Sequence, residues 1–225
     1  MFSCKQAVNN KAEQVILKKS QRDIVTSQIE TPRSSFTELI IDTFPEGFVD
    51  LVKIDSSILT DIRYATDSNF TNQNLYPCAR CILKKEVAKK LSLVNQELTK
   101  KGYRLKMLDC YRPLSVQKVL WETNPDSRFV MSPSKGSGHS RGTAVDVTLV
   151  SRDGQELNMG SSYDEFSGKA FYNYAALPDE VKRLRWILKT NMQEKGFNAL
   201  RTEWWHFQYG NRKAESVMDF TWKCK

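Results

Sequence analysis

Residues 137–146 have the sequence SGHSRGTAVD, and the fold and chemistry of this chain can be read outward from them. The run 143–150 alternates, with valines on one face and Asp146 on the other, which is typical of a strand. His139 lies at the loop end of that strand. A buried carboxylate is costly if left unpaired, so Asp146 needs a cation or hydrogen-bond donors. The alternatives are that Asp146 caps a turn or pairs with Arg141.

The second of the chain's two histidines lies in the motif EWWH, residues 203–206. One aspartate and two histidines suit a catalytic zinc that keeps one position open for water. We therefore predict His139, Asp146 and His206 as metal ligands. Glu203 is then free to act as the base on that water. On a regular strand Glu203 and His206 would point to opposite faces, so Glu203 must lie on the turn that enters the strand or beside a bulge.

A third motif, DCYRP at residues 109–113, adds a positive charge. It follows a predicted strand and precedes a predicted helix, a position from which Arg112 can enter a cleft. A guanidinium beside the metal would stabilise an oxyanion in the transition state. The alternative is a surface arginine paired with Asp109.

The composition indicates one sizeable domain with a polar extension. The chain has 225 residues, 40% of them hydrophobic, which is enough for a packed core. Residues 1–43 are polar and predict an N-terminal arm or tether, whereas apolar residues become frequent from Phe44, so we place the folded domain at 44–225. No stretch approaches the roughly 18–20 apolar residues that a membrane span needs.

Local patterns predict helices and strands without regular alternation. The elements are helices at 84–101, at 178–195 and after Pro113, and strands at 103–108, 143–150 and 204–209. This order favours an α+β fold over a doubly wound sheet. We expect a single domain with a mainly antiparallel sheet flanked by helices.

The cysteines and the net charge are less specific signals. Cys78 and Cys81 have the spacing of half a zinc ribbon, but no second such pair exists, so a structural or disulfide role is favoured over a metal or redox role. Whether Cys78, Cys81 and Cys110 form a disulfide stays open. Residues 2–4, Phe-Ser-Cys, resemble the end of a bacterial lipoprotein signal, which predicts a lipid anchor at Cys4. The net charge of +8 suits an anionic neighbourhood, yet no nucleic-acid-binding motif is present and no such partner is expected.

The motifs together resemble a known family. SGHSRGTAVD, EWWH, DCYRP and RYATDSNF at residues 63–70 resemble the zinc D-alanyl-D-alanine dipeptidases of the vancomycin-resistance type, which share a fold with the Hedgehog signalling domain. The resemblance runs from about Phe44 to about Phe220. It implies one zinc ion per chain, bound by His139, Asp146 and His206.

The resemblance also implies roles around the zinc. Glu203 would be general base and acid, and Arg112 would polarise the scissile carbonyl. Tyr64 would line the substrate pocket and Ser137 would hydrogen-bond the substrate. Asp164, in the loop 159–164, would bind the free ammonium group. The family often has a second serine where this chain has Gly138.

The implied function is hydrolysis of D-Ala-D-Ala or a related dipeptide. One alternative is a peptidoglycan D,D-carboxypeptidase or endopeptidase, which would have an open cleft without an acid at the ammonium position. Another is a non-catalytic zinc-binding module, which would be expected to lack Glu203 or Arg112. The expected location is the bacterial periplasm or cell envelope, with the cytoplasm as the alternative. The sequence indicates no oligomeric state.

Overall fold

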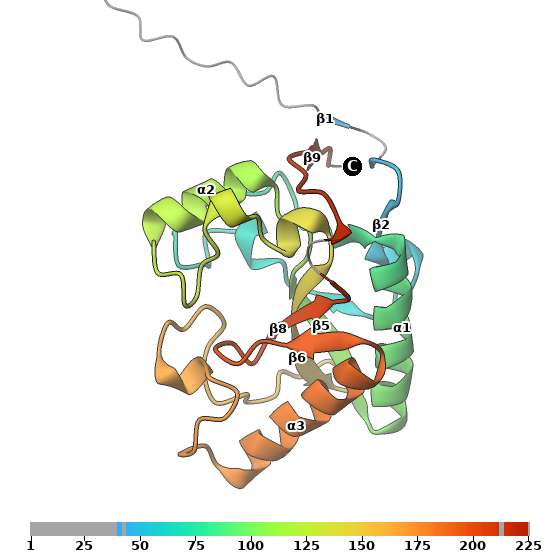
Figure 1. Cartoon of the computed structure of the whole chain (residues 1–225). Helices are drawn as coiled ribbons and strands as arrows, with labels where there is room; N and C mark the ends of the chain where they lie inside the picture. Colours follow the sequence, from blue (N-terminus) through green and yellow to red (C-terminus); the bar gives the residue numbers. More distant parts are fainter. Residues whose placement is uncertain (1–39, 42–43, 212–213, 225) are drawn as a thin grey trace, which may run out of the picture. The chain divides into compact units, whose positions relative to one another are not determined.

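The alternating run predicted at 143–150 forms β6, the central strand of a five-stranded sheet (Figure 1). The computed structural model describes residues 40–41, 44–211 and 214–224, which belong to one compact unit. The predicted arm at 1–43 lies outside these residues except for β1 (Ile40–Ile41), and so does the lipid anchor predicted at Cys4. The domain boundary at Phe44 therefore stays a prediction.

The central sheet is mainly antiparallel, as expected. Its strands are, in spatial order, β3 (Leu59–Thr60), β5 (Tyr103–Asp109), β6 (Ala144–Ser151), β8 (His206–Tyr209) and β7 (Phe197–Ala199). Only the β3–β5 pair is parallel within this described sheet. Two small sheets accompany it: β2 (Phe48–Asp50) pairs with β4 (Ile82–Lys84), and β1 pairs with β9 (Thr221–Trp222). The α+β prediction is confirmed.

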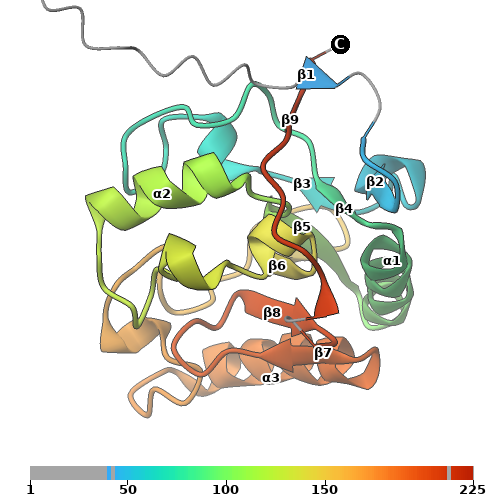
Figure 2. The same cartoon turned by 45° about the horizontal axis from the view of Figure 1, so that its top comes forward.

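Helices flank this sheet. They are α1 (Lys85–Lys100), α2 (Leu114–Thr123) and α3 (Asp179–Glu194). α1 packs on β5, α3 packs on β7, and the two helices touch each other, while α2 lies apart from both (Figure 2). No helix among the described residues is both long and apolar enough to cross a membrane.

Each predicted helix is present, and the two with predicted bounds, 84–101 and 178–195, are each one residue shorter at both ends. In α1 the predicted apolar stripe is buried, and the chain leaves the helix through Gly102 at a φ of +85°, a left-handed conformation that glycine adopts without strain. In α3 the helix follows Pro178, and Asp179 and Glu180 lie in its first turn, where negative charge is favourable.

The strand predicted at 204–209 is shorter than expected. β8 begins only at His206, because Trp204 and Trp205 form a turn in which the Trp204 backbone N–H donates to Ala170. Both indole rings are buried and meet edge to face, which holds this turn against the domain. Glu203 therefore lies ahead of the strand rather than on it.

A β-bulge changes which face of β5 meets the site. Met107 pairs with Val147 on the core face, but the next paired residue is Asp109, which lies opposite Asp146. Two residues of β5 thus correspond to one of β6, and Leu108 is the extra residue. Without the bulge, Asp109 would face the core together with Met107.

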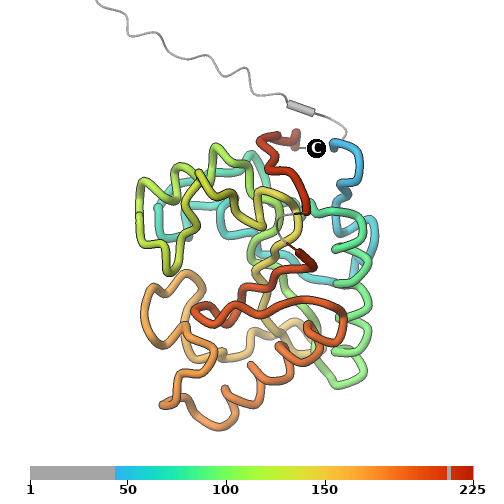
Figure 3. Tube along the Cα trace, viewed as in Figure 1, coloured from blue at the N-terminus to red at the C-terminus, as the bar shows by residue number. Residues whose placement is uncertain are grey.

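Two disulfides tie the edges of the fold together. Cys78 pairs with Cys224, and Cys81 pairs with Cys110, so the favoured disulfide role is confirmed and the two close cysteines take different partners. The C-terminal segment, red in Figure 3, returns to the side where the described domain begins. There the ring of Phe220 stacks on Tyr111 with centroids 4.1 Å apart.

Candidate active site

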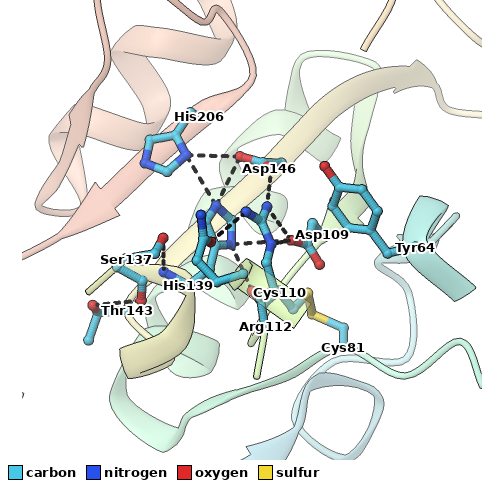
Figure 4. Close-up of polar contacts among 12 residues, drawn as sticks. Tyr64, Cys81, Asp109, Cys110, Arg112, Ser137, His139, Thr143, Asp146 and His206 are labelled. Atoms are coloured by element: carbon cyan, nitrogen blue, oxygen red, sulfur yellow. Dashed lines mark hydrogen bonds and ion pairs between the residues drawn. A yellow bond between two sulfur atoms is a disulfide. The ribbon is translucent and has the colours of Figure 1, made fainter. Parts of the chain in front are cut away.

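Three side chains from separate elements converge at the end of β6. His139 begins the short 3-10 turn His139–Arg141, Asp146 lies on β6, and His206 lies opposite it on β8. His206 Nδ1 is 3.0 Å from Asp146 Oδ1 and 3.2 Å from His139 Nε2. The third side of this triangle, from His139 Nε2 to Asp146 Oδ1, is 3.3 Å (Figure 4).

These separations fit a tetrahedral metal. Zinc bonds of roughly 2.0–2.1 Å in tetrahedral geometry place neighbouring ligand atoms roughly 3.3–3.4 Å apart. The three ligand atoms lie within 4.8 Å of one another, and all three residues line the cavity described below. The predicted ligand set is thus brought together by the fold. The alternative partner of Asp146, Arg141, bonds the backbone carbonyls of Glu215 and Lys135 instead.

Neighbouring groups orient the predicted ligands. The Nδ1 of His139 lies 2.8 Å from the backbone carbonyl of Cys110, so this nitrogen carries the proton and Nε2 is free to bind a metal. The Tyr163 hydroxyl donates to Asp146 Oδ2 at 2.9 Å, which leaves Oδ1 for the metal. Such contacts from a second layer of residues commonly raise metal affinity.

Electrostatics favour the protonation states that a metal requires. Burial alone would raise the pKa of Asp146, but the imidazoles of His139 and His206 outweigh it and hold that pKa well below its ordinary value. Burial lowers the pKa of His206 despite the neighbouring Asp146 carboxylate. An ionised carboxylate and a neutral imidazole are the ligand forms that bind zinc.

Arg112 is buried, so its predicted alternative as a surface residue is wrong. It does pair with Asp109: its Nε and Nη2 donate to Asp109 Oδ2 at 2.9 and 2.7 Å, and its Nη1 donates to Gln117 at 2.9 Å. Its Nη2 also lies 3.7 Å from Asp146 Oδ2. Burial opposes its charge, but the surrounding acidic groups raise the pKa of Arg112 well above its ordinary value. Arg112 thus presents a permanent positive charge beside the ligand triangle.

Glu203 lies just ahead of β8, in agreement with the prediction that it lies on the turn that enters the strand or beside a bulge. Its side chain is 9% exposed, and its Oε2 is 3.9 Å from His206 Nδ1. Burial, reinforced by the charges of Asp146 and Asp164, raises the pKa of Glu203 well above its ordinary value. A carboxyl group with a raised pKa exchanges protons more readily near neutral pH.

Tyr64 and Asp164 form the opposite side of the site (Figure 4 shows Tyr64 across from His206). The Tyr64 hydroxyl donates to Asp164 Oδ2 at 2.8 Å, and the Arg112 guanidinium lies 5.0 Å from the centre of the Tyr64 ring. Asp164 has a φ of +56°, an uncommon conformation that aspartate tolerates better than most residues. Burial raises the pKa of Asp164 to about 7.

All eight predicted site residues line one cavity of about 310 Å³. They are Tyr64, Arg112, Ser137, His139, Asp146, Asp164, Glu203 and His206. This volume is at the lower end of the range for ligand pockets and suits a small molecule. Ser137 is buried, and its Oγ accepts the backbone N–H of His139 at 3.2 Å.

The buried part of the site is rich in negative charge. The carboxyl groups of Asp109, Asp164 and Glu203 interact electrostatically with the guanidinium of Arg112, and Asp146 Oδ2 lies 3.7 Å from its Nη2. When these groups are ionised, the described cluster carries more negative than positive charge, and a divalent cation would offset the difference. The donor set and the local charge therefore both fit a bound metal.

Some functional neighbours escaped prediction. Asp109 appeared only as the partner of a surface Arg112, whereas it is fully buried and also accepts the Tyr76 hydroxyl at 2.8 Å. Tyr163 and the Cys110 carbonyl were not anticipated at all. Most of their contacts join residues far apart in the chain, and the one local signal was that Asp109 and Cys110 belong to the DCYRP motif and Tyr163 to the loop 159–164.

Comparisons with known proteins identify the family of this chain. The D-ala-D-ala dipeptidase family matches residues 45–222. A D-alanyl-D-alanine dipeptidase of Escherichia coli is 35% identical over 180 residues, 78% of this chain and 91% of that protein. One of Enterococcus faecium is 29% identical over 182 residues, 72% of this chain and 90% of that protein.

Among solved structures, VanYB in complex with D-Alanine-D-Alanine is similar over 60% of this chain and 75% of that chain, at 15% identity. Its TM-score is 0.41, too low to carry an argument about function. The family match over residues 45–222 includes all four motifs and most of the described domain. This chain belongs to the D-ala-D-ala dipeptidase family.

Proposed function

We propose that this chain is a zinc-dependent dipeptidase that hydrolyses D-Ala-D-Ala or a closely related dipeptide. The observation that carries the proposal is the convergence of a three-ligand metal triangle, a buried carboxyl group and a buried guanidinium on one small cavity. His139, Asp146 and His206 would hold one zinc ion per chain. Bound zinc supplies a Lewis acid and makes water a better nucleophile at neutral pH.

Glu203 is the proposed proton carrier. Its carboxylate accepts a proton from the attacking water and then donates that proton to the leaving amine. The raised pKa of Glu203 supports this double role, because the group must be able both to take up and to release a proton. Its position 3.9 Å from His206 sets it beside the ligand triangle without making it a ligand.

Arg112 is the proposed electrophilic group. Asp109 and Gln117 fix the guanidinium in one orientation, so no reorganisation is needed when negative charge develops on the carbonyl oxygen. Loss of one such donor typically slows catalysis by about 10²–10³-fold. The 3.7 Å approach of its Nη2 to Asp146 keeps the positive charge next to the reacting centre.

Asp164 and Tyr64 are proposed to recognise the free ammonium group, and Ser137 the rest of the backbone. A carboxylate at one end of a cavity of about 310 Å³ favours a short substrate with a charged amino terminus. This arrangement also weighs against the carboxypeptidase or endopeptidase alternative, which would lack an acid there. The presence of Glu203 and Arg112 in the cavity weighs against a non-catalytic zinc-binding module.

A location in the bacterial cell envelope or periplasm is part of the proposal. Disulfides persist in oxidising compartments and are rare in the cytoplasm of most organisms. The Cys78–Cys224 and Cys81–Cys110 pairs therefore favour the envelope over the cytoplasmic alternative. The lipid anchor at Cys4 remains a prediction, and mass spectrometry of the protein isolated from its native membrane fraction would test it.

The deciding experiment measures release of free D-alanine from D-Ala-D-Ala by the zinc-loaded protein. The same assay is run on an N-acetylated peptide ending in D-Ala-D-Ala, on the chelated protein and on Glu203→Gln. We expect turnover of the free dipeptide alone, with full zinc binding but no turnover in Glu203→Gln. Turnover of the N-acetylated peptide would assign the carboxypeptidase reaction instead. If the zinc-bound protein cleaved neither substrate, the proposal would be refuted.

A further inference from the structure

The two disulfides differ in their relation to the site. Cys81 and Cys110 are each 1% exposed, and Cys110 stands between Asp109 and Arg112 in the chain. Figure 4 shows this disulfide beside the side chains of Asp109, Arg112 and His139. By contrast, the Cys78–Cys224 pair includes an exposed cysteine.

Cys110 acts on the site through its backbone. Its carbonyl oxygen accepts the Nδ1–H of His139 at 2.8 Å, and this contact determines which ring nitrogen faces Asp146 and His206. A shift of that carbonyl would free His139 to rotate or to change tautomer. Substitution of groups that orient a metal ligand typically weakens metal binding by about 10–100-fold.

The same short segment carries Arg112. The segment is held by backbone hydrogen bonds from Tyr111 to Ile82 at 2.9 Å and from Arg112 to His139 at 3.2 Å. Cys81 directly precedes Ile82, so the disulfide and the Tyr111 hydrogen bond fasten the segment to the same point of β4. The disulfide is the covalent part of this attachment.

We propose that the Cys81–Cys110 disulfide positions the metal site, holding the Cys110 carbonyl against His139 and the adjoining segment that carries Arg112. Metal affinity and turnover therefore depend on this disulfide being formed. Reduction by a phosphine breaks the S–S bond and yields two thiols, while the phosphine takes oxygen from water and becomes a phosphine oxide. This inference rests on the proposed function in that His139 is taken as a metal ligand.

The second disulfide provides a matched control. The Cys78–Cys224 pair lies beside Trp222, whose indole N–H donates to the Cys78 carbonyl at 3.2 Å. Neither cysteine lines the cavity of the site. Its removal takes away a covalent link of the same kind without touching the residues that orient His139.

The test compares C81A/C110A with C78A/C224A, both loaded with zinc. We expect the zinc dissociation constant of C81A/C110A to rise about 10-fold or more and its kcat to fall, with C78A/C224A staying within about 2-fold of the parent protein. Circular dichroism in the near ultraviolet checks that both variants are folded. Equal zinc affinity in the two variants would overturn the proposal.

A second measurement covers the case in which C81A/C110A does not fold. C78A/C224A keeps only the buried disulfide among its described cysteines, so stepwise phosphine reduction of that variant reports on Cys81–Cys110. Zinc release before the loss of near-ultraviolet dichroism is expected, and release only together with unfolding would contradict positioning. Failure of the proposed function would look different, because the parent protein would then bind zinc without cleaving D-Ala-D-Ala.

Discussion

The Cys78–Cys224 disulfide should contribute strongly to stability, and the length of the loop that it closes allows this contribution to the free energy of unfolding to be calculated. The two cysteines are 146 residues apart in the chain. In the chain-entropy model, opening a loop of that length lowers the free energy of unfolding by about 5 kcal/mol at 25 °C. The Cys81–Cys110 loop, with a separation of 29 residues, contributes about 1.4 kcal/mol less by the same relation.

The variant C78A/C224A isolates this entropic contribution. Cys224 is exposed, so its removal leaves no cavity, and the Tyr111 hydroxyl still bonds both the N–H and the C=O of Phe220, which keeps the segment docked. Urea unfolding of the metal-free parent and variant, followed by tryptophan fluorescence, gives the difference in the free energy of unfolding. We expect a loss that approaches about 5 kcal/mol.

A small loss of stability in C78A/C224A would refute the chain-entropy explanation. If the variant lost less than about 1 kcal/mol, the disulfide would not restrict the unfolded chain as the loop length requires. A change in the slope of free energy against urea would point instead to altered compactness of the unfolded state. The comparison also bears on the metal site, since C78A/C224A should lose much stability and little zinc affinity.

The remaining predictions concern single site residues. Because burial raises the pKa of Asp164 to about 7, the group is protonated below that pH, so the KM for D-Ala-D-Ala should fall as pH rises through about 7. Asp164→Asn should raise KM and abolish this dependence in steady-state assays. Arg112→Lys keeps the charge but loses the paired contact with Asp109, and kcat should fall by about 10²-fold with little change in zinc content. Gly138→Ser would bring Cβ within 1.9 Å of Gln208 Oε1 and should destabilise the fold by about 1–3 kcal/mol, which Gln208→Ala should partly restore in a double-mutant cycle.

Most elements of the fold could be predicted from local sequence. The α1 and α3 helices were predictable because their apolar stripes and their stop signals at Gly102 and Gly196 lie within a few turns of chain. The side chains of the ligand triangle could be predicted because the chain has only two histidines, His139 and His206, and each lies in a motif that also carries an acidic residue. The alternation of a strand also predicted that Glu203 must lie on the turn that enters the strand or beside a bulge, and Glu203 lies ahead of β8.

The features that could not be predicted depend on contacts between residues far apart in the chain. Nothing in the spacing of Cys78 and Cys81 indicates that they pair with partners 146 and 29 residues away. The role of Asp109 depends on the bulge at Leu108, which is visible only when β5 is set against β6. Tyr163 reaches Asp146 from a loop whose path the sequence does not determine.

The bulge at Leu108 has a consequence for how this protein can change over generations. A change of one residue in a surface loop is usually harmless, but a change that flattened the bulge with Leu108 in place would restore the regular alternation of β5. Asp109 would turn to the core, and Arg112 would lose the carboxylate that holds it. We therefore expect descendants of this sequence to vary in length in the loops but to keep the bulge between Met107 and Asp109.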